Sequence, residues 1–407
     1  MTVELQINNG VSPMTRFVSW APSPSRIRVT NPSGATTPLV NVQITGRSTA
    51  GGGEATFGRN ATGPFSSSLT VAVPIAGASV PFFVAGRFGR PSVNNEDVRI
   101  EARTGTTIVG SVQVMVRVRK NANRLSAAER DRFVSAFAQL NNQGAGRFVD
   151  FRDMHTSASS PQAHGAAGFL PWHRAYLLDL ERELQAIDPS VSLPYWRFDQ
   201  PAPNLFTRDF LGVADSLGTV QFSPSNPLQF WRTDGVQGIN RRPFFNTSSA
   251  PPGLRNEAQT LGLGSQYAAF RTMEGNPHGS AHTSFGGSIS SIPTAARDPL
   301  FFLLHCNVDR LWAKWQRQLG RFNPAQPASY DSNSSNPIGH NLPDTMWPWN
   351  GVTTAPRPST APGGTLATSP STAAPGLSPI VSQMIDYQAV GGGAALGFAY
   401  DDVPFEV

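Results

Sequence analysis

Histidine is rare in this chain, and six of its seven copies fall into two triplets. These are His155, His164 and His173 in the first, and His278, His282 and His305 in the second. Three imidazoles are enough to hold one metal ion, so two triplets in separate segments predict a pair of ions. Only His340 is left over. The spacing therefore predicts a two-metal site, and the ligand chemistry indicates which metal it takes.

The donor types favour copper, zinc or nickel. Coordination by imidazole alone, with no carboxylate or thiolate, does not suit magnesium or calcium. Zinc hydrolysis would want a glutamate directly after the first histidine of a His-x-x-x-His pair, but His278 is followed by Gly279. Two copper ions, each cycling between Cu(I) and Cu(II), would supply two electrons to O2. The pattern thus favours oxidase or oxygen-carrier chemistry over hydrolysis by a zinc enzyme, which stays a third alternative.

Helices are predicted to position the histidines. Residues 170–187 form an amphipathic pattern in which His173 is in phase with the leucine stripe. A second helical pattern follows residues 298–299 and places His305 among its inward positions. The first two histidines of the second triplet lie four residues apart, on one face of a short helix. An inward imidazole needs a partner, because an unsatisfied buried polar group is costly.

The chain is predicted to be an α+β protein of several parts. Residues 1–119 alternate apolar and polar side chains between Gly, Pro and Asn turns, which predicts an antiparallel β-sandwich. Ser126 and Glu129 form a capping box that begins a helical domain. We expect a di-copper catalytic domain over 120–350 and a Pro/Ser/Thr-rich linker or surface loop over 351–380. The C-terminal segment, 381–407, is expected to pack back on the catalytic domain.

Composition argues against several classes of protein. The net charge is +5, but the basic residues are scattered, which disfavours nucleic-acid binding. No apolar run approaches the roughly 18 residues that span a bilayer, and the N-terminus lacks a signal-peptide pattern. We expect a soluble, cytoplasmic protein without a membrane partner. A single cysteine, Cys306, excludes an intramolecular disulfide.

Four segments around the histidines resemble the copper-binding regions of the type 3 copper family of tyrosinases, catechol oxidases and polyphenol oxidases. They are MHTSASSPQAHGAAGFLPWHRAYLLDLERELQ, LPYWRFD, EGNPHGSAHTSFGG and DPLFFLLHCNVDRLWAKWQ. The resemblance covers residues 120–350. It implies that the first triplet binds one copper ion and the second triplet the other. It also implies a four-helix bundle core around the ions, and O2 as co-substrate.

The resemblance also implies roles for residues near the metals. Glu274 matches a carboxylate that orients a water able to accept a phenol proton, and the alternative is that it caps the turn before His278. Many relatives have asparagine where this chain has Gly279, which implies weaker monophenol hydroxylation. Ile292 is our candidate for the apolar gate of the substrate pocket. An aromatic substrate is expected to lie between that gate and the ring of His282.

Three further positions depart from the family or leave alternatives open. No cysteine lies near His164, so the thioether found in many relatives is expected to be absent, and Cys306 is expected to pack inertly. Leu304 replaces a further histidine that is not a ligand. Asp309 has two readings: it accepts a hydrogen bond from a ligand imidazole, or it belongs to a surface ion pair.

The leading functional prediction is a copper enzyme that uses O2 to oxidise o-diphenols to o-quinones. Oxidation of o-aminophenols and weaker monophenol hydroxylation belong to the same prediction. The alternative is a reversible O2 carrier like the haemocyanins, whose di-copper site is shielded from phenols. We hypothesise that the N-terminal sandwich shields the site or mediates assembly into a homo-oligomer.

Overall fold

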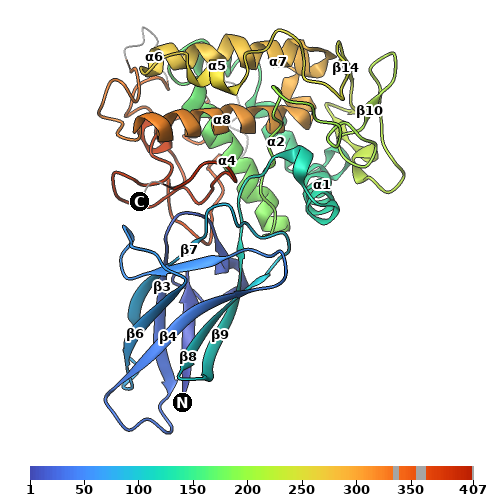
Figure 1. Ribbon diagram of the computed structural model, residues 1–407. Helices are drawn as coiled ribbons and strands as arrows, with labels where there is room; N and C mark the ends of the chain where they lie inside the picture. Colours follow the sequence, from blue (N-terminus) through green and yellow to red (C-terminus); the bar gives the residue numbers. More distant parts are fainter. Residues whose placement is uncertain (333–338, 354–363, 406–407) are drawn as a thin grey trace. The chain divides into compact units, whose positions relative to one another are not determined.

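The computed structural model describes residues 1–332, 339–353 and 364–405. The chain divides into two compact units. The first contains residues 1–118, 369–374 and the stretch from 394, and the second contains the remainder. Strands build the first unit and helices dominate the second (Figure 1). The predicted order, a β region followed by a helical region in an α+β protein, is confirmed.

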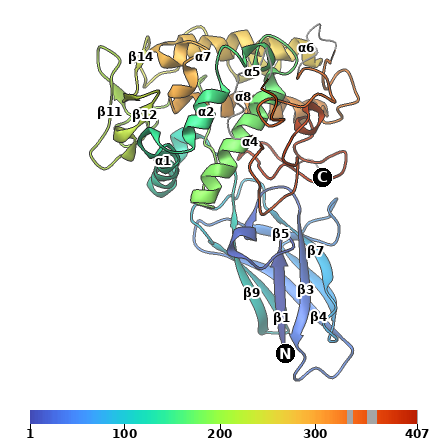
Figure 2. The same cartoon turned by 180° about the vertical axis from the view of Figure 1, so that it is seen from behind.

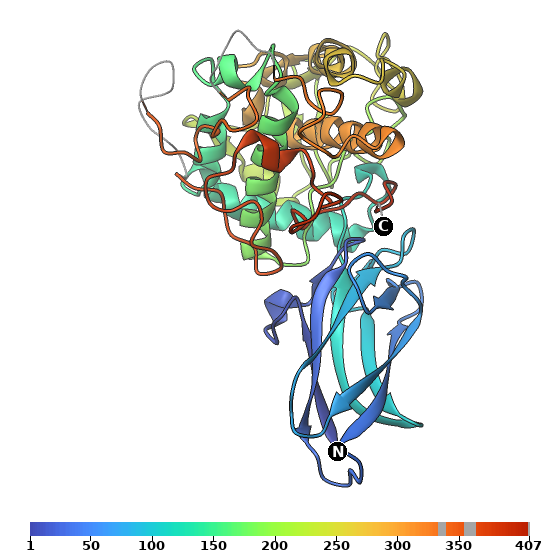
Figure 3. The same ribbon diagram turned by 90° about the vertical axis from the view of Figure 1, so that its left-hand side faces the viewer.

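The first unit holds two sheets whose strands run roughly along one direction (Figure 3). One sheet has the order β1 (Thr2–Ile7), β3 (Ser23–Asn31), β7 (Val80–Gly86), β5 (Ala55–Gly58). The other has the order β2 (Phe17–Val18), β9 (Thr107–Val116), β8 (Val98–Thr104), β4 (Leu39–Ser48), β6 (Ser68–Pro74). All of these pairs are antiparallel except β2 with β9, which is parallel. The expectation of purely antiparallel pairing is therefore wrong at this edge, because β2 reaches its sheet by a crossover from the other one.

One apolar core lies between these two sheets. Buried and exposed side chains alternate along β3, so that Ile27 and Val29 point inward. They join a single cluster with residues of the second sheet such as Val42, Val71 and Ile100. Burial on one face of each sheet explains the two-residue period of the sequence.

The helical unit contains eight α-helices among its described residues. They are α1 (Ala127–Asn141), α2 (Phe148–Met154), α3 (Ser160–Ala163), α4 (Phe169–Ile187), α5 (Glu257–Leu261), α6 (Tyr267–Phe270), α7 (Ser280–Thr283) and α8 (Leu300–Leu319). Short strands form three further ladders: β10 (Val213–Ala214) with β11 (Val220–Gln221), β12 (Arg232–Thr233) with β13 (Val236–Gln237), and β14 (Arg241–Pro243) with β15 (Phe285–Gly287). None of the described helices combines the length and apolarity needed to cross a membrane.

The helix boundaries follow local sequence signals. Ser126 accepts a hydrogen bond from the Glu129 backbone, and the Glu129 side chain accepts one from the Ser126 backbone, so the predicted capping box is confirmed. Helix α8 begins at Leu300, whose backbone N–H donates to the Asp298 carboxylate at 2.9 Å. The same carboxylate pairs with Arg241 at 2.8 Å. The start of α8 is therefore tied to β14.

Helices α4 and α8 are packed against each other and are almost entirely buried (Figure 2). A buried ionic network joins them. Asp309 of α8 accepts from Arg174 of α4 at 2.6 Å and from Arg119 at 3.1 Å, and Arg119 pairs with Glu181 of α4 at 2.7 Å. Both readings of Asp309 are wrong, because its carboxylate is buried between two guanidinium groups. Sequence reasoning missed this network because Arg119 precedes the first helix of the unit by several residues.

The C-terminal part of the chain divides between the two units. Residues 375–393 belong to the helical unit, where Arg174 donates to the Met384 carbonyl at 2.7 Å. The stretch from 394 belongs to the β unit, where Trp20 donates to the Tyr400 carbonyl at 2.7 Å. The division thus differs from the expectation that all of 381–407 packs on the catalytic domain, because Ala399 completes the core of the sheets.

Part of the expected linker also has defined contacts. Its residues 354–363 lie outside the described residues, and the described remainder, 351–353 and 364–380, carries no helix or strand. Asp179 of α4 accepts hydrogen bonds from the Trp349 indole and the Ala367 backbone, both at 2.8 Å. The chain is thereby fixed to α4 on either side of the undescribed stretch.

Candidate metal centre

The six histidines form two clusters within the helical unit. In each cluster the ring nitrogens that could bind an ion lie within 4.8 Å of one another. The first cluster is His155, His164 and His173; the second is His278, His282 and His305. Among the described residues, no other group of this kind was found. The prediction that each triplet converges is confirmed.

Different elements deliver the ligands of the first cluster. His173 projects from the first turns of α4, so a rigid helix fixes its position. His155 directly follows α2, and His164 directly follows α3, so each occupies the end of a short helix. The loop between them therefore lets three residues spaced nine apart reach one point.

The second cluster uses two neighbouring turns and one long helix. His278 lies in a π-type turn, Gly275–Gly279, that leads directly into α7, and His282 lies on α7. His305 projects from α8. The four-residue spacing of the first two brings their ring centroids to 4.7 Å, as expected for one helical face.

Backbone carbonyls orient four of the six imidazoles. The Nδ1 atoms of His173 and His278 lie 2.9 and 2.7 Å from carbonyl oxygens four residues earlier in the chain. The Nδ1 of His155 lies 3.0 Å from the Ile292 carbonyl, and that of His282 lies 2.7 Å from the Ile289 carbonyl. A carbonyl accepts only, so Nδ1 carries the proton and Nε2 keeps its lone pair for a metal.

The remaining nitrogens fit a cation. The Nε2 atom of His305 lies 3.2 Å from that of His278 and 3.1 Å from that of His282. It can donate to one of them at most, which leaves lone pairs facing each other in a buried site. In the first cluster, the Nε2 of His173 is buried and has no hydrogen-bond partner. A positive ion at the centre of each cluster satisfies these nitrogens, and an all-imidazole donor set suits copper.

Burial keeps the imidazoles neutral. It lowers the pKa of His155 to about 3 and that of His282 to about 4. It also lowers the pKa values of His164, His173, His278 and His305 well below the ordinary value. Only the neutral imidazole binds a metal, so the folded protein holds its ligands in the binding form at neutral and mildly acidic pH.

Comparisons with known proteins agree with this geometry. The family described as "Common central domain of tyrosinase" matches residues 145–318, which contain all six histidines. The tyrosinase of Streptomyces glaucescens is 35% identical over 270 residues, covering 58% of this chain and 94% of that protein. The chain belongs to the tyrosinase family of type 3 copper proteins. Its two triplets form a binuclear copper site, and the chain is a tyrosinase-family oxidoreductase.

Two further similarities are to a curated relative and to a solved structure. The grixazone synthase of Streptomyces griseus is 29% identical over 310 residues, covering 59% of this chain and 96% of that protein. Among solved structures, the deoxygenated hemocyanin of Rapana thomasiana has a TM-score of 0.48 and 22% identity, with coverage of 71% and 70%.

Phenylalanine rings surround the copper ligands of this tyrosinase-family protein. Phe301 lies 4.7 Å from the ring of His155 and 4.2 Å from that of His305, between centroids. Phe169 lies 4.8 Å from His173 and 4.9 Å from His278. Each phenylalanine therefore contacts a ligand of both triplets. Sequence reasoning missed Phe169, although its position four residues before His173 on the same helical face was a usable signal.

Glu274 lies between the two triplets. Its carboxylate accepts a hydrogen bond from the backbone N–H of Gly165, next to His164, at 2.7 Å. Its backbone carbonyl accepts from His278. The side chain does not cap the turn that follows, which removes the capping alternative. Burial raises the pKa of the Glu274 carboxyl above its ordinary value.

Of the three expected substrate-binding residues, Gly279 and His282 lie at the second triplet, and Ile292 contacts the first. Gly279 directly follows His278 in helical conformation, and a Cβ added there would lie 3.3 Å from the Glu274 carbonyl. His282 is partly exposed. The Ile292 side chain is 42% exposed, while its carbonyl holds His155. This backbone contact was not predicted.

Cys306, Leu304 and His340, which the sequence analysis also named, are not copper ligands. Cys306 is buried, and its sulfur lies 3.6 Å from the Leu193 carbonyl oxygen. It belongs to neither ligand triplet. Leu304 is fully buried as an apolar core residue. His340 accepts from the Gly168 backbone and contacts the Pro161 carbonyl, each at 2.9 Å. His340 therefore fastens the chain near the start of α4.

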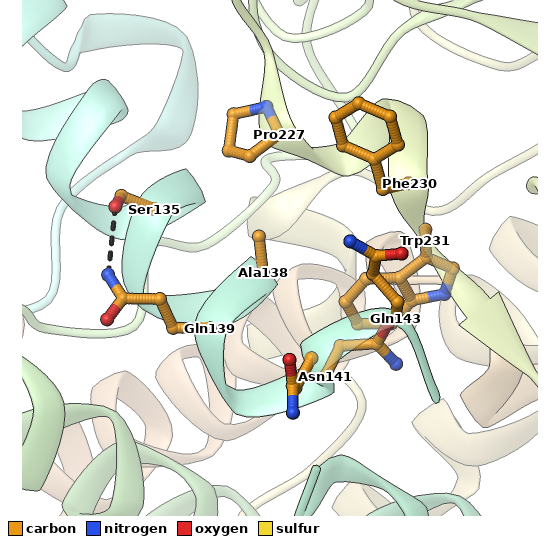
Figure 4. A pocket seen from close by; sticks show the side chains of 9 residues that line it. Ser135, Ala138, Gln139, Asn141, Gln143, Pro227, Phe230 and Trp231 are labelled. Carbon is orange, nitrogen blue, oxygen red and sulfur yellow. Dashed lines mark hydrogen bonds between the residues drawn. The ribbon is translucent and has the colours of Figure 1, made fainter. Parts of the chain in front are cut away.

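A separate cavity of about 210 Å³ lies between α1 and the segment that precedes β12 (Figure 4). Pro227, Phe230 and Trp231 line it from the segment before β12, and Gln139 of α1 and Gln143 of the turn after α1 line it as well. No histidine is among the residues that line it. The cavity is thus distinct from the copper centre.

Proposed function

We propose that this tyrosinase-family copper oxidase converts o-diphenols to o-quinones, with O2 reduced to water. Two diphenols then yield two quinones for each O2 that becomes two waters. The observation that carries the proposal is the accessibility of the ligands within the helical unit. In each triplet one imidazole is partly exposed, His164 in the first and His282 in the second, while the other two are buried.

The partly exposed ligands have suitable neighbours for a phenol. Ile292 follows the segment that orients His282 and exposes a large part of its apolar side chain. An aromatic ring can lie between that side chain and the His282 imidazole, which already has its plane fixed by the Ile289 carbonyl. Copper, when bound, exchanges electrons with O2 and the phenol. The chain's own residues orient the ring and exclude water from the buried ligands.

Glu274 is the proposed proton acceptor. Its carboxylate is held at the backbone of Gly165, adjacent to the exposed ligand His164. A phenol has an ordinary pKa of about 10, so a nearby base is needed to form the phenolate that monophenol hydroxylation requires. Gly279 offers no side chain to hold a water beside that carboxylate. We therefore propose that o-diphenols are better substrates than monophenols.

Finer features of the fold belong to the same proposal. The four-helix bundle core would include α2, α4, α7 and α8, which are among the helices that carry or directly precede a copper ligand. The two sheets of the first unit would form the β-sandwich. We also propose that the first unit mediates assembly into a homo-oligomer. Light scattering of the full chain tests this by measuring the molar mass in solution.

Steady-state oxygen uptake on the copper-loaded protein tests the proposal. Catechol, o-aminophenol and tyrosine are compared at equal concentration. We expect the highest kcat/KM for an o-diphenol or o-aminophenol and a lower value for tyrosine. Reversible O2 binding, with no steady-state oxygen consumption in the presence of any of the three substrates, would instead favour the haemocyanin-like carrier.

A further inference from the structure

A single loop touches both copper sites. The 286–294 loop, which runs from Gly286 to Thr294, begins in the last two residues of β15 and includes the 3-10 turn Ser288–Ser290. Its Ile289 carbonyl lies 2.7 Å from the Nδ1 of His282, in the second triplet. Its Ile292 carbonyl lies 3.0 Å from the Nδ1 of His155, in the first triplet. Two acceptors three residues apart therefore orient one ligand of each ion.

This arrangement differs from that of the other oriented ligands. His173 and His278 contact carbonyls four residues earlier in their own segments, at Phe169 and Glu274. Those contacts form whenever the local turn forms. The contact of His155 instead depends on a loop 137 residues away in sequence. The orientation of His155 therefore depends on the loop's tertiary placement.

Internal hydrogen bonds hold the loop in one shape. The Thr294 hydroxyl donates to the Ser288 carbonyl at 2.8 Å, and the Thr294 backbone donates to the Ser291 carbonyl at 3.0 Å. The side chain of Ile289 is fully buried and anchors the middle of the loop. These contacts fix the spacing and direction of the two orienting carbonyls.

A glycine anchors the start of the loop against β14. Gly287 has φ 94° and ψ −158°, a region that essentially only glycine adopts. A Cβ at Gly287 would lie 2.3 Å from the Asn240 carbonyl. The next residue, Ser288, donates its backbone N–H to that same carbonyl at 3.1 Å. Close approach of the two backbones at this point sets where the loop begins.

We propose that the 286–294 loop is a shared positioning element that couples the copper affinities of the two sites. Loosening the loop frees His155 and His282 together, so both sites lose affinity at once. The loop acts through the ligand imidazoles, and its residues are positioning residues. The inference rests on the binuclear copper site and not on the phenol chemistry proposed above.

The test measures copper affinity at each site separately. His164→Ala leaves only the second site able to bind tightly, and His278→Ala leaves only the first. Thr294→Val is placed in each of these backgrounds, and copper dissociation constants are measured by competition with a chelator. We expect affinity to fall about 10- to 100-fold at both sites, the usual loss when a group that orients a ligand is disturbed. Thr294→Ser, which keeps the hydroxyl, should restore the affinity.

Two controls separate the proposal from general damage. Thr207→Val removes an exposed hydroxyl that donates to the Asn204 carbonyl at 3.3 Å, and should leave both affinities unchanged. Gly287→Ala should weaken both sites, whereas Gly235→Ala, at φ 77° with open space around it, should weaken neither. A cooperative unfolding transition of each metal-free variant shows that the variant has folded. If Gly287→Ala does not fold, the Thr294 pair decides.

Loss of affinity at one site only, or at neither, would overturn the proposal. So would an equal loss in Thr294→Val and Thr294→Ser, because the hydroxyl would then not matter. The readout is metal binding without any phenol present. The copper affinities therefore test the loop proposal even if the proposed oxidase function is wrong.

Discussion

The imidazole rings of His173 and His305 stack face to face, with centroids 4.2 Å apart and 11° between their planes. One ring belongs to each copper triplet, and each projects from a long buried helix, α4 or α8. The residue after His173, Arg174, pairs with Asp309 one turn after His305. The same helix pair therefore sets both the separation of the two copper sites and the buried ionic network behind them.

Asp309→Asn should destabilise the fold severely. The substitution leaves Arg119 and Arg174 buried with one carboxylate fewer, and breaking a buried ion pair in this way costs about 3–5 kcal/mol in the free energy of unfolding. Urea unfolding measures the loss. Asp131→Asn is the matched control, because Asp131 is 63% exposed in its pair with Arg130, and it should change stability by less than about 0.5 kcal/mol. Equal effects of the two variants would contradict the role of the network.

Glu274→Gln should impair monophenol hydroxylation more than diphenol oxidation. Loss of a general base lowers turnover by about 10²- to 10⁴-fold. Oxidation of an o-diphenol depends less on the base, because an o-diphenol is more acidic than a monophenol and needs no hydroxylation. Burial raises the pKa of Glu274, and the base acts only when deprotonated. In the native protein, monophenol turnover should therefore rise with pH through a value above the ordinary carboxyl pKa.

The assay compares kcat for tyrosine and catechol as a function of pH. Glu129→Gln serves as the control, since glutamine also satisfies the capping box at the start of α1. Parallel losses on both substrates in Glu274→Gln would show that this carboxylate supports the structure and does not accept the phenol proton.

Gly279→Asn should raise the ratio of monophenol to diphenol turnover. Gly279 has helical φ and ψ of −60° and −37°, so a side chain is tolerated if the Glu274 carbonyl shifts by a few tenths of an ångström. The new amide could hold a water near the Glu274 carboxylate. Gly279→Ala adds the Cβ without the amide and should leave the ratio unchanged. An unchanged ratio in the asparagine variant would argue against water-holding at this position.

Copper binding at pH 6 should release few protons. Six imidazoles with the ordinary pKa of about 6.5 would carry about four to five protons at that pH, all of which copper would displace. Burial lowers the pKa of His155 to about 3 and of His282 to about 4, and lowers those of the other four ligands as well. The six ligand imidazoles are therefore already deprotonated in the metal-free protein at pH 6. Calorimetry in two buffers of different ionisation enthalpy counts the protons, and release of four or more would contradict this account.

The copper ligands could be predicted because histidine is rare and six of its seven copies fall into two triplets. His173 and His305 share the phase of their helices' apolar residues, and this periodicity alone marks an inward position. The capping box at Ser126 was equally visible, because all of its interactions lie within four residues. Local patterns of this kind survive folding unchanged.

The remaining features depend on tertiary contacts that no local pattern encodes. The carbonyls of Ile289 and Ile292 orient ligands through backbone atoms, so their side chains carry no sign of the role. Asp309 finds its partners on other elements, which made a surface pair look equally plausible. The parallel pairing of the two-residue strand β2 offers too short a pattern to read.

Copper titration of the metal-free protein, with catechol-dependent oxygen uptake recorded at each addition, tests the central claim most directly. The account predicts that uptake reaches its maximum at two copper ions per chain and is lost in His305→Ala. It also predicts that His340→Gln retains two ions, because the His340 imidazole contacts the backbone of Gly168 and Pro161 and lies outside both triplets. A maximum at one ion per chain, or two bound ions without oxygen uptake, would contradict it.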